Sequence, residues 1–309
     1  MLEVRGLTKS FGKLTAVSDV SFQVRQGEAF GLLGPNGAGK STIISMLFGL
    51  LQPEQGEILI VGQPLWEDPI AAKRLLGYVP QEIALYPELS AQENLVFWGR
   101  LYGLVGAQLK ERVAHVLDVV GLSERARGRV STFSGGMKRR INIAAALLHQ
   151  PRLLIMDEPT VGIDPQSRNH ILETVRRLNQ EGMTIIYTSH YMEEVEYLCS
   201  RIGIIDHGKI IALGTVPELR QIVGEDSQIA VTVQGLDDQG LAKLSQLEHV
   251  RQAKLQEDQL LVVSPEPALA LGAISTLLAA CDVKMRSIRV TEPNLETVFL
   301  HLTGRALRD

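Results

Sequence analysis

Short apolar runs recur along the first two thirds of the chain, and stretches with helical periodicity separate them. A run of four or five apolar residues between turn residues is typical of a strand that is buried on both faces, as in a parallel sheet. Helices between such strands cover the two faces of the sheet. The pattern therefore predicts an α/β domain with a mostly parallel sheet and buried strands at residues 29–33, 153–156, 184–187 and 202–205.

Three segments depart from this alternation. Strand-like sequence precedes the first helix within residues 1–50, and His207-Gly208-Lys209 is typical of a hairpin turn between two edge strands. From residue 90 to about residue 148 the apolar positions recur three and four apart, which indicates helices. We therefore predict a helical subdomain at about residues 85–150.

The pattern changes again near residues 224–227, where small and charged residues interrupt it. The remaining segments alternate as strand, helix, strand, strand, helix and strand, followed by a last helix. This β-α-β-β-α-β order resembles a ferredoxin-like split unit. We predict two domains: residues 1–220, and a small α+β accessory domain at residues 225–309.

Composition agrees with two domains, since 309 residues exceed the size of one ordinary domain. The formal net charge of −4 excludes a general attraction to nucleic acid or anionic membranes. The two isolated cysteines form no metal-spaced pair and favour a reducing compartment. The N-terminus has no apolar core of a secretion signal, and the longest weakly polar stretch, residues 268–280, is too short to span a bilayer. We expect a cytoplasmic protein that reaches a membrane only through a partner.

One glycine-rich segment has the spacing of a phosphate-binding loop, G-x-x-x-x-G-K-[ST]. It consists of Gly34, Pro35, Asn36, Gly37, Ala38, Gly39, Lys40, Ser41 and Thr42. In such a loop the backbone N–H groups converge on phosphate oxygens, the lysine reaches the β- and γ-phosphates, and the hydroxyl of Ser41 is placed to ligate Mg²⁺. A predicted strand precedes the segment and a predicted helix follows it, which a chance glycine-rich turn would lack. The segment predicts binding of a nucleoside triphosphate with Mg²⁺.

The strand at residues 153–156 runs directly into two acids, Asp157 and Glu158. A carboxylate at such a strand end can hold Mg²⁺ beside the phosphates, and a second one can orient and deprotonate the attacking water. An acid pair that caps a helix after a core strand is the alternative interpretation. The phosphate loop upstream favours the catalytic one.

A second anion site is predicted where Ser134, Gly135 and Gly136 precede the helix that starts near Lys138, because a helix start exposes N–H groups. Alone, the tetrapeptide Ser134-Gly135-Gly136-Met137 would indicate only a capped helix. After the phosphate loop and before Asp157-Glu158-Pro159-Thr160, however, Phe133-Ser134-Gly135-Gly136-Met137 resembles the signature of ABC-transporter ATPases.

Three further segments resemble motifs of the same family and occur in its order. Val79-Pro80-Gln81-Glu82 resembles the glutamine loop, Ile163-Asp164 the D-loop, and Thr188-Ser189-His190 the switch histidine. The resemblance covers about residues 1–220. It implies a P-loop NTPase core with an antiparallel N-terminal β-subdomain and a helical subdomain, and it implies ATP as the nucleotide.

The resemblance also implies roles for these residues. Asp157 would support the metal and Glu158 would be the general base. Gln81 would touch the metal and the γ-phosphate, while its loop reports occupancy to a membrane partner. His190 would contact the γ-phosphate, although a histidine at a strand end is ordinarily a packed residue.

The signature implies a second ATPase subunit. Ser134 and Gly136 would contact the γ-phosphate of a nucleotide held by the other subunit, and Gly135 and the D-loop residue Asp164 would also take part in nucleotide binding. Two copies would then sandwich two ATP molecules head to tail, as a homodimer or a pseudo-symmetric heterodimer. Phe11 lies where the family carries an aromatic that stacks on adenine; the alternative is a core phenylalanine of the first strand pair.

Some positions depart from the family pattern. Met137 replaces the usual polar glutamine of the signature, and Val161 replaces the usual small serine near the D-loop. Both lie where the dimer interface is expected. Lys138-Arg139-Arg140 could suggest nucleic-acid binding, but no aromatics are interleaved with it, so we predict a solvated helix face and no nucleic-acid partner.

The resemblance further implies an integral membrane permease as partner, with the chain peripheral at the inner face of the cell membrane. The aromatic segment at residues 86–98 predicts an exposed apolar cleft for that partner beside the glutamine loop. The ending from Val290 through Glu292-Pro293-Asn294-Leu295-Glu296 to Arg305 resembles that of bacterial exporter ATPases with separate six-helix permeases. An importer ATPase with a C-terminal regulatory domain is the alternative. A non-transport ATPase acting on ribosomes or DNA fits less well, because neither paired cassettes nor long heptad insertions occur.

Overall fold

The structure is a computed structural model that describes residues 1–222, 226–291 and 294–304. The described residues up to Val216 form one compact unit, and the described residues from Pro217 to Gly304 form a second. Each unit has its own cluster of buried hydrophobic side chains. Glu292, Pro293 and Arg305 of the exporter-like ending lie outside the described residues.

The first unit is built on a six-stranded sheet in the order β10-β9-β3-β8-β7-β6. Neighbouring strands from β9 to β6 are parallel, and β10 pairs antiparallel with β9 after a turn at His207 and Gly208. This confirms the mostly parallel sheet predicted from the apolar runs and the hairpin predicted from the turn residues His207-Gly208-Lys209. The strands are β3 (Ala29–Leu33), β6 (Leu76–Val79), β7 (Leu153–Asp157), β8 (Thr184–Ser189), β9 (Arg201–Asp206) and β10 (Lys209–Gly214).

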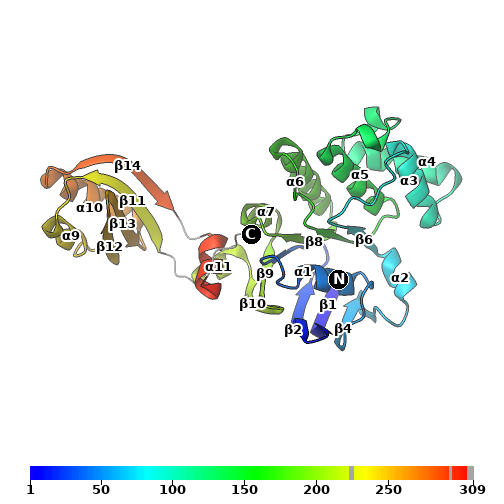
Figure 1. The fold of residues 1–309 in the computed structure, drawn as a ribbon, viewed down its shortest axis with the longest axis horizontal. Coiled ribbons are helices and arrows are strands. Elements are labelled where there is room, and N and C mark those ends of the chain that lie inside the picture. The colour runs from blue at the N-terminus through cyan, green and yellow to red at the C-terminus, as the bar shows by residue number, and fades with distance from the viewer. Residues whose placement is uncertain (223–225, 292–293, 305–309) are drawn as a thin grey trace. The chain divides into compact units, whose positions relative to one another are not determined.

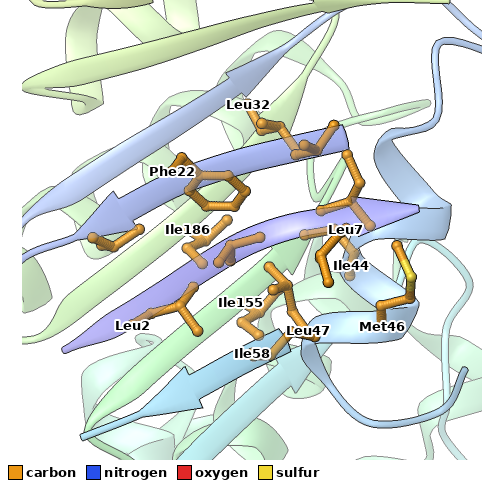
Figure 2. Close-up of a cluster of buried hydrophobic side chains, with 14 of the residues drawn as sticks. Leu2, Leu7, Phe22, Leu32, Ile44, Met46, Leu47, Ile58, Ile155 and Ile186 are labelled. Carbon is orange, nitrogen blue, oxygen red and sulfur yellow. The ribbon is translucent and has the colours of Figure 1, made fainter. Parts of the chain in front are cut away.

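A second, antiparallel sheet comes from the N-terminal segment, in the order β2-β1-β4-β5. Its strands are β1 (Leu2–Phe11), β2 (Leu14–Val24), β4 (Gln55–Ile60) and β5 (Gln63–Pro64). The main core joins this sheet to the parallel sheet and to helix α1 (Lys40–Leu47). Figure 2 shows Leu2, Leu7 and Phe22 of the antiparallel sheet facing Ile155 and Ile186 of the parallel one. The phosphate loop thus leaves one sheet and enters a helix that packs against both.

Three helices form a separate group beside β6, where residues 85–150 were expected to be helical (Figure 1). They are α3 (Ala91–Leu101), α4 (Gly106–Val119) and α5 (Gly135–Leu147). Helix α3 begins with a capping box, in which Ser90 and Glu93 bond each other's backbone N–H groups. The remaining α-helices of this unit are α2 (Pro69–Arg74), α6 (Pro165–Gln180) and α7 (Met192–Leu198). Helix α8 (Val216–Gln221) begins at the last residue of the first unit and otherwise belongs to the second.

The second unit has the element order that the sequence predicts. Its four strands form an antiparallel sheet in the order β12-β13-β11-β14, and helices α9 and α10 supply part of its core. The elements are β11 (Ser227–Gln234), α9 (Asp238–Leu244), β12 (Gln252–Gln256), β13 (Gln259–Ser264), α10 (Pro267–Ala280), β14 (Lys284–Thr291) and α11 (Leu295–Thr303). Among the described helices of the chain, none is both long and apolar enough to cross a membrane.

The parallel sheet sets the position of the candidate chemistry. Strand β8 lies between β3 and β7, and all three run in the same direction. Their C-terminal ends therefore meet at one edge of the sheet, which is where ligands bind in open α/β sheets. The phosphate loop follows β3, Glu158 follows β7, and His190 follows β8.

Candidate nucleotide-binding site

The phosphate loop turns from β3 into α1 through a position that requires glycine. Gly39 precedes the first helical residue with φ of 106°. A Cβ atom there would lie 2.5 Å from the carbonyl oxygen of Ala16. The left-handed backbone and the close approach exclude a side chain, so the loop can fold tightly over the start of α1. The N–H groups at this helix start are the ones that an anion can use.

Lys40 lies almost buried at the floor of the loop, with 4 % of its surface exposed. Its Nζ donates to the carbonyl oxygen of Gly34 at 2.7 Å and to that of Pro35 at 3.2 Å. The same ammonium lies 3.0 Å from Oε1 of Glu158. The lysine is thus held by the loop it belongs to and by the acid that directly follows β7.

Asp157 ends β7 and accepts a hydrogen bond from the neighbouring strand. The Thr188 hydroxyl donates to its Oδ1 at 2.7 Å. Burial raises the pKa of Asp157, while the Thr188 and Ser41 hydroxyls and the nearby Lys40 oppose that rise and Glu158 adds to it. The loop hydroxyl and the strand-end carboxylate, both predicted as metal ligands, therefore lie together.

Glu158 occupies a left-handed conformation, with φ of 45°, directly after the strand. Its backbone N–H donates to Thr188 Oγ1 at 2.9 Å. Its carboxylate is 6 % exposed and lies between Lys40 and His190, whose Nδ1 is 3.5 Å from Oε2. A non-glycine residue at positive φ is uncommon and is concentrated at functional sites.

A cleft of about 330 Å³ brings several of the predicted residues together. Phe11 is 52 % exposed and lines the cleft, so it is not a core residue of the first strand pair. Gln81 and Glu158 line the cleft together with residues 35–37 and 39–42 of the phosphate loop. The cleft therefore combines an aromatic face, a phosphate loop, a polar amide and a buried acid.

The signature and the D-loop do not line this cleft. The Ser134 hydroxyl caps α5 by accepting from Met137 N at 3.2 Å, and Asp164 Oδ1 caps α6 by accepting from Ser167 N at 2.9 Å. The two motifs contact each other, because a Cβ atom on Gly136 would collide with the Ser167 side chain and would lie 3.6 Å from Asp164 Oδ2. Within one chain, Ser134, Gly135, Gly136 and Asp164 are thus separate from the loop that they are expected to serve.

Two residues, Thr188 and Glu194, have structural roles at the site that the sequence interpretation did not assign to them. Thr188 joins Asp157 to the backbone of Glu158, and its register opposite Asp157 in the parallel pair explains the contact. Glu194 of α7, 3 % exposed, accepts from the hydroxyls of Thr160 at 2.7 Å, Tyr187 at 2.8 Å and Ser189 at 3.1 Å. Thr188 could have been noticed in the sequence as a polar residue at the end of a buried strand. Nothing in the sequence around Glu194 indicates its role.

The burial of Arg139 contradicts one of the predictions made from the sequence. The Lys138-Arg139-Arg140 run was expected to be a solvated helix face, but Arg139 is only 3 % exposed. Its guanidinium donates to the carbonyl oxygens of Pro80, at 2.6 Å, and Gln81. The prediction was wrong because charge alone does not show that a helix face meets a loop with free carbonyls.

The residues present fit a Mg²⁺ ion shared with phosphates. Within the described part of the chain no group of three or more histidine, cysteine and acidic side chains forms a metal cage. Mg²⁺ ordinarily needs only one or two protein ligands when phosphate oxygens and waters complete its shell. The Ser41 hydroxyl, which lowers the pKa of Asp157, and the Asp157 carboxylate itself offer such a pair of oxygen ligands.

Comparisons with known proteins agree with this geometry. The ABC transporter family profile matches residues 17–161. The chain is 54 % identical over 312 residues to the linearmycin resistance ATP-binding protein LnrL of Bacillus subtilis, covering 100 % of both chains. It is 41 % identical to the Nod factor export ATP-binding protein I of Cupriavidus pinatubonensis, covering 100 % of this chain and 92 % of the other.

A solved structure shares the fold of most of the first unit. It is a dimeric ATP-binding cassette in a post-hydrolysis state bound to ADP and Pi. It is 25 % identical, with a TM-score of 0.63, and the match covers 70 % of this chain and 98 % of that one. The chain therefore belongs to the ABC transporter family, as one of its ATP-hydrolysing subunits.

Proposed function

We propose that this chain hydrolyses MgATP as one half of an ATP-sandwich dimer and thereby drives export through a separate membrane permease. The observation that carries the proposal is the cleft, which Phe11 and the phosphate loop line together and in which Glu158 lies against Lys40. Adenine would stack on Phe11 while the phosphates bind the loop amides and Lys40.

The two acids after the apolar run of β7, Asp157 and Glu158, would have different roles, one at the metal and one at the attacking water. Ser41 and Asp157, with Gln81 facing the same cleft, would hold Mg²⁺, which when bound neutralises charge on the β- and γ-phosphates. Glu158 would accept the proton of the attacking water, since its carboxylate reaches the cleft and its backbone is anchored by Thr188. His190, beside Glu158, would donate to the γ-phosphate and keep the transition-state geometry.

A second subunit would complete the site. Ser134, Gly135, Gly136 and Asp164 do not line the cleft of their own chain, which supports their use at a nucleotide held by another copy. A head-to-tail pair satisfies both clefts at once by symmetry. The dimeric cassette described above supports the same arrangement.

The permease would dock beside the glutamine loop. An apolar hollow of about 170 Å³ lies there, lined by aromatic and small side chains, namely Phe48, Tyr78, Pro80, Ala84, Trp98, Tyr102, Asn142, Ala145 and Ala146. Such a surface suits an amphipathic helix of a partner protein. Relatives named for linearmycin resistance and Nod factor export support the export direction.

The test begins with Glu158→Gln, which should bind ATP without turning it over. With MgATP this variant should elute as a dimer in size-exclusion chromatography with light scattering, and with MgADP as a monomer. A monomer that holds ATP at saturation would contradict the sandwich. Membrane flotation of the wild-type chain, with and without its co-expressed permease, tests the partner: the chain should float only when the permease is present.

A further inference from the structure

The glutamine loop is attached to the signature helix by two side chains of α5. Arg139 donates from Nη1 to Pro80 O at 2.6 Å and from Nη2 to Gln81 O. One turn later, Asn142 Oδ1 accepts from Ala84 N at 3.3 Å, and its Nδ2 lies 3.5 Å from Glu82 O. The backbone of the glutamine loop, at Gln81 and on both sides of it, is therefore hydrogen-bonded to side chains of α5.

These bonds leave the side chain of Gln81 free to act in the cleft. Arg139 and Asn142 are each 3 % exposed, whereas Gln81 is exposed and lines the nucleotide cleft. The two anchors bond only backbone groups of the loop. They therefore hold its path without using the amide that is expected to meet the γ-phosphate.

Burial of the Arg139 guanidinium is expected to lower the folding stability of the chain, because a buried charge loses its hydration. Among the described residues no acid forms an ion pair with Arg139, and its Nε is buried without a hydrogen-bond partner. Burial lowers the pKa of Arg139, against the attraction of Tyr187 and Asp157. An apolar side chain of similar volume would ordinarily be at least as stable in such a position, so the charge points to a role beyond packing.

The same helix starts at the signature. Ser134 caps α5 and Gly136 lies in its first turn, three residues before Arg139. A helix of 13 residues moves as one body, so a displacement of the loop at Arg139 is carried to Ser134 and Gly136.

We propose that Arg139 and Asn142 are positioning residues that fasten the glutamine loop to the signature helix. Engagement of Gln81 at the nucleotide of its own chain thereby sets the position of the signature offered to the other chain. This rests on the sandwich dimer proposed above, and what it adds is the identity of the two side chains that attach the glutamine loop to α5.

The test compares Arg139→Met with a matched control on the same helix, Arg140→Met. Arg140 donates to Val120 O at 3.2 Å, at the end of α4, and has no hydrogen bond to the glutamine loop among the described residues. In the Glu158→Gln background, Arg139→Met should weaken ATP-driven dimerisation by about 5- to 150-fold. Binding of ATP to the monomer should change by less than about twofold in both variants, as should dimerisation of the control.

Two further measurements separate positioning from folding. Arg139→Met with Glu158 intact should lower kcat, on the order of 10²-fold, with little change in KM. In a Gln81→Ala background the same substitution should have little further effect, because both act through one loop. Should Arg139→Met not fold, Asn142→Ala replaces it and should weaken dimerisation in the same way.

The outcomes distinguish the two proposals. If neither the Glu158→Gln parent nor Arg140→Met dimerises with ATP, the sandwich itself is wrong. If the parent dimerises and Arg139→Met or Asn142→Ala dimerises equally well, the positioning role is wrong. Full additivity with Gln81→Ala would equally overturn it.

Discussion

Lys40 Nζ lies 3.0 Å from Glu158 Oε1, and both side chains are buried. The lysine expected to bind phosphate is thus paired with the acid expected to activate water. A phosphate that enters the loop competes with this carboxylate for one ammonium group. Binding of the nucleotide and release of the base are therefore linked through a single contact.

Glu158→Gln should retain ATP binding and lose hydrolysis by about 10²–10⁴-fold, because an amide cannot accept the proton of the attacking water. Affinity for ATP should not fall, since Lys40 loses an anionic competitor. Phosphate release and calorimetric binding measure the two effects. The control is Glu181→Gln at the exposed C-cap of α6, which should turn over at the wild-type rate. Wild-type turnover in Glu158→Gln would refute its role as the base.

Lys40→Ala should weaken ATP binding by about 1.5–3 kcal/mol through the loss of a charged hydrogen-bond donor. Without nucleotide it should also unfold more easily, because Glu158 then stays buried without its ion pair. Adding Glu158→Gln should recover part of that stability. Thermal unfolding of the two single variants and the double variant measures the coupling, with the exposed Lys110→Ala as control. Strict additivity would show that the pair contributes nothing.

Phe11→Ala should reduce affinity for ATP by about 1–3 kcal/mol, the usual contribution of an aromatic ring stacked on a base. Binding of tripolyphosphate, which has no base, should be unchanged. Leu14→Ala is a suitable control, because Leu14 is also exposed on the cleft. An equal loss for ATP and tripolyphosphate would exclude stacking as the role of Phe11.

His149 should make stability fall in mild acid. Its ring stacks on Tyr102 with centroids 3.7 Å apart, and its Nε2 lies 2.9 Å from Leu76 O. Burial lowers the pKa of His149 below its ordinary value of 6.5, so the unfolded chain binds the proton more readily. Stability is therefore present above about pH 6.5 and is lost as the pH falls from there towards the lowered pKa.

Urea unfolding at about pH 7.5 and about pH 5.5 measures this effect. His149→Gln should show a smaller difference in stability between the two values than the wild type. His115→Gln, an exposed substitution on α4, should keep the wild-type difference. If all three proteins respond alike, His149 is not the source of the acid sensitivity.

Tyr187→Phe tests the buried hydroxyl cluster around Glu194. Its hydroxyl donates to Glu194 Oε2 at 2.8 Å, and removing a donor to a charged group should cost about 1.5–3 kcal/mol of unfolding free energy. Tyr197→Phe, whose exposed hydroxyl accepts from Arg176, should cost less than about 0.5 kcal/mol. Equal costs would mean that Glu194 is satisfied without Tyr187.

The sequence predicts those parts of the structure whose signals are local. A buried parallel strand needs an unbroken apolar run, so β3 and β7–β9 could be recognised from their own residues. The phosphate loop depends on the spacing of adjacent glycines, and the hairpin at His207 and Gly208 on a two-residue turn.

The parts that could not be predicted depend on residues far apart in the chain. Arg139 binds a carbonyl 59 residues earlier, and nothing around it in the sequence distinguishes it from Lys138 or Arg140. Thr188 meets Asp157 only because β7 and β8 pair in one particular register. Glu194 accepts hydrogen bonds from three hydroxyl groups, which lie on segments that come together only in the folded chain.

The tight packing of Gly136 on Ser167 affects how the signature should be altered in mixed dimers. Any side chain at Gly136 would displace the N-terminus of α6 in the same molecule, so the defect would spread to that chain's own D-loop. In a mixed dimer that should carry an inactive signature in one subunit and an intact one in the other, Gly136 is therefore a poor position to substitute. Ser134 is the cleaner position, because the hydrogen bond of its hydroxyl is the cap of its own helix.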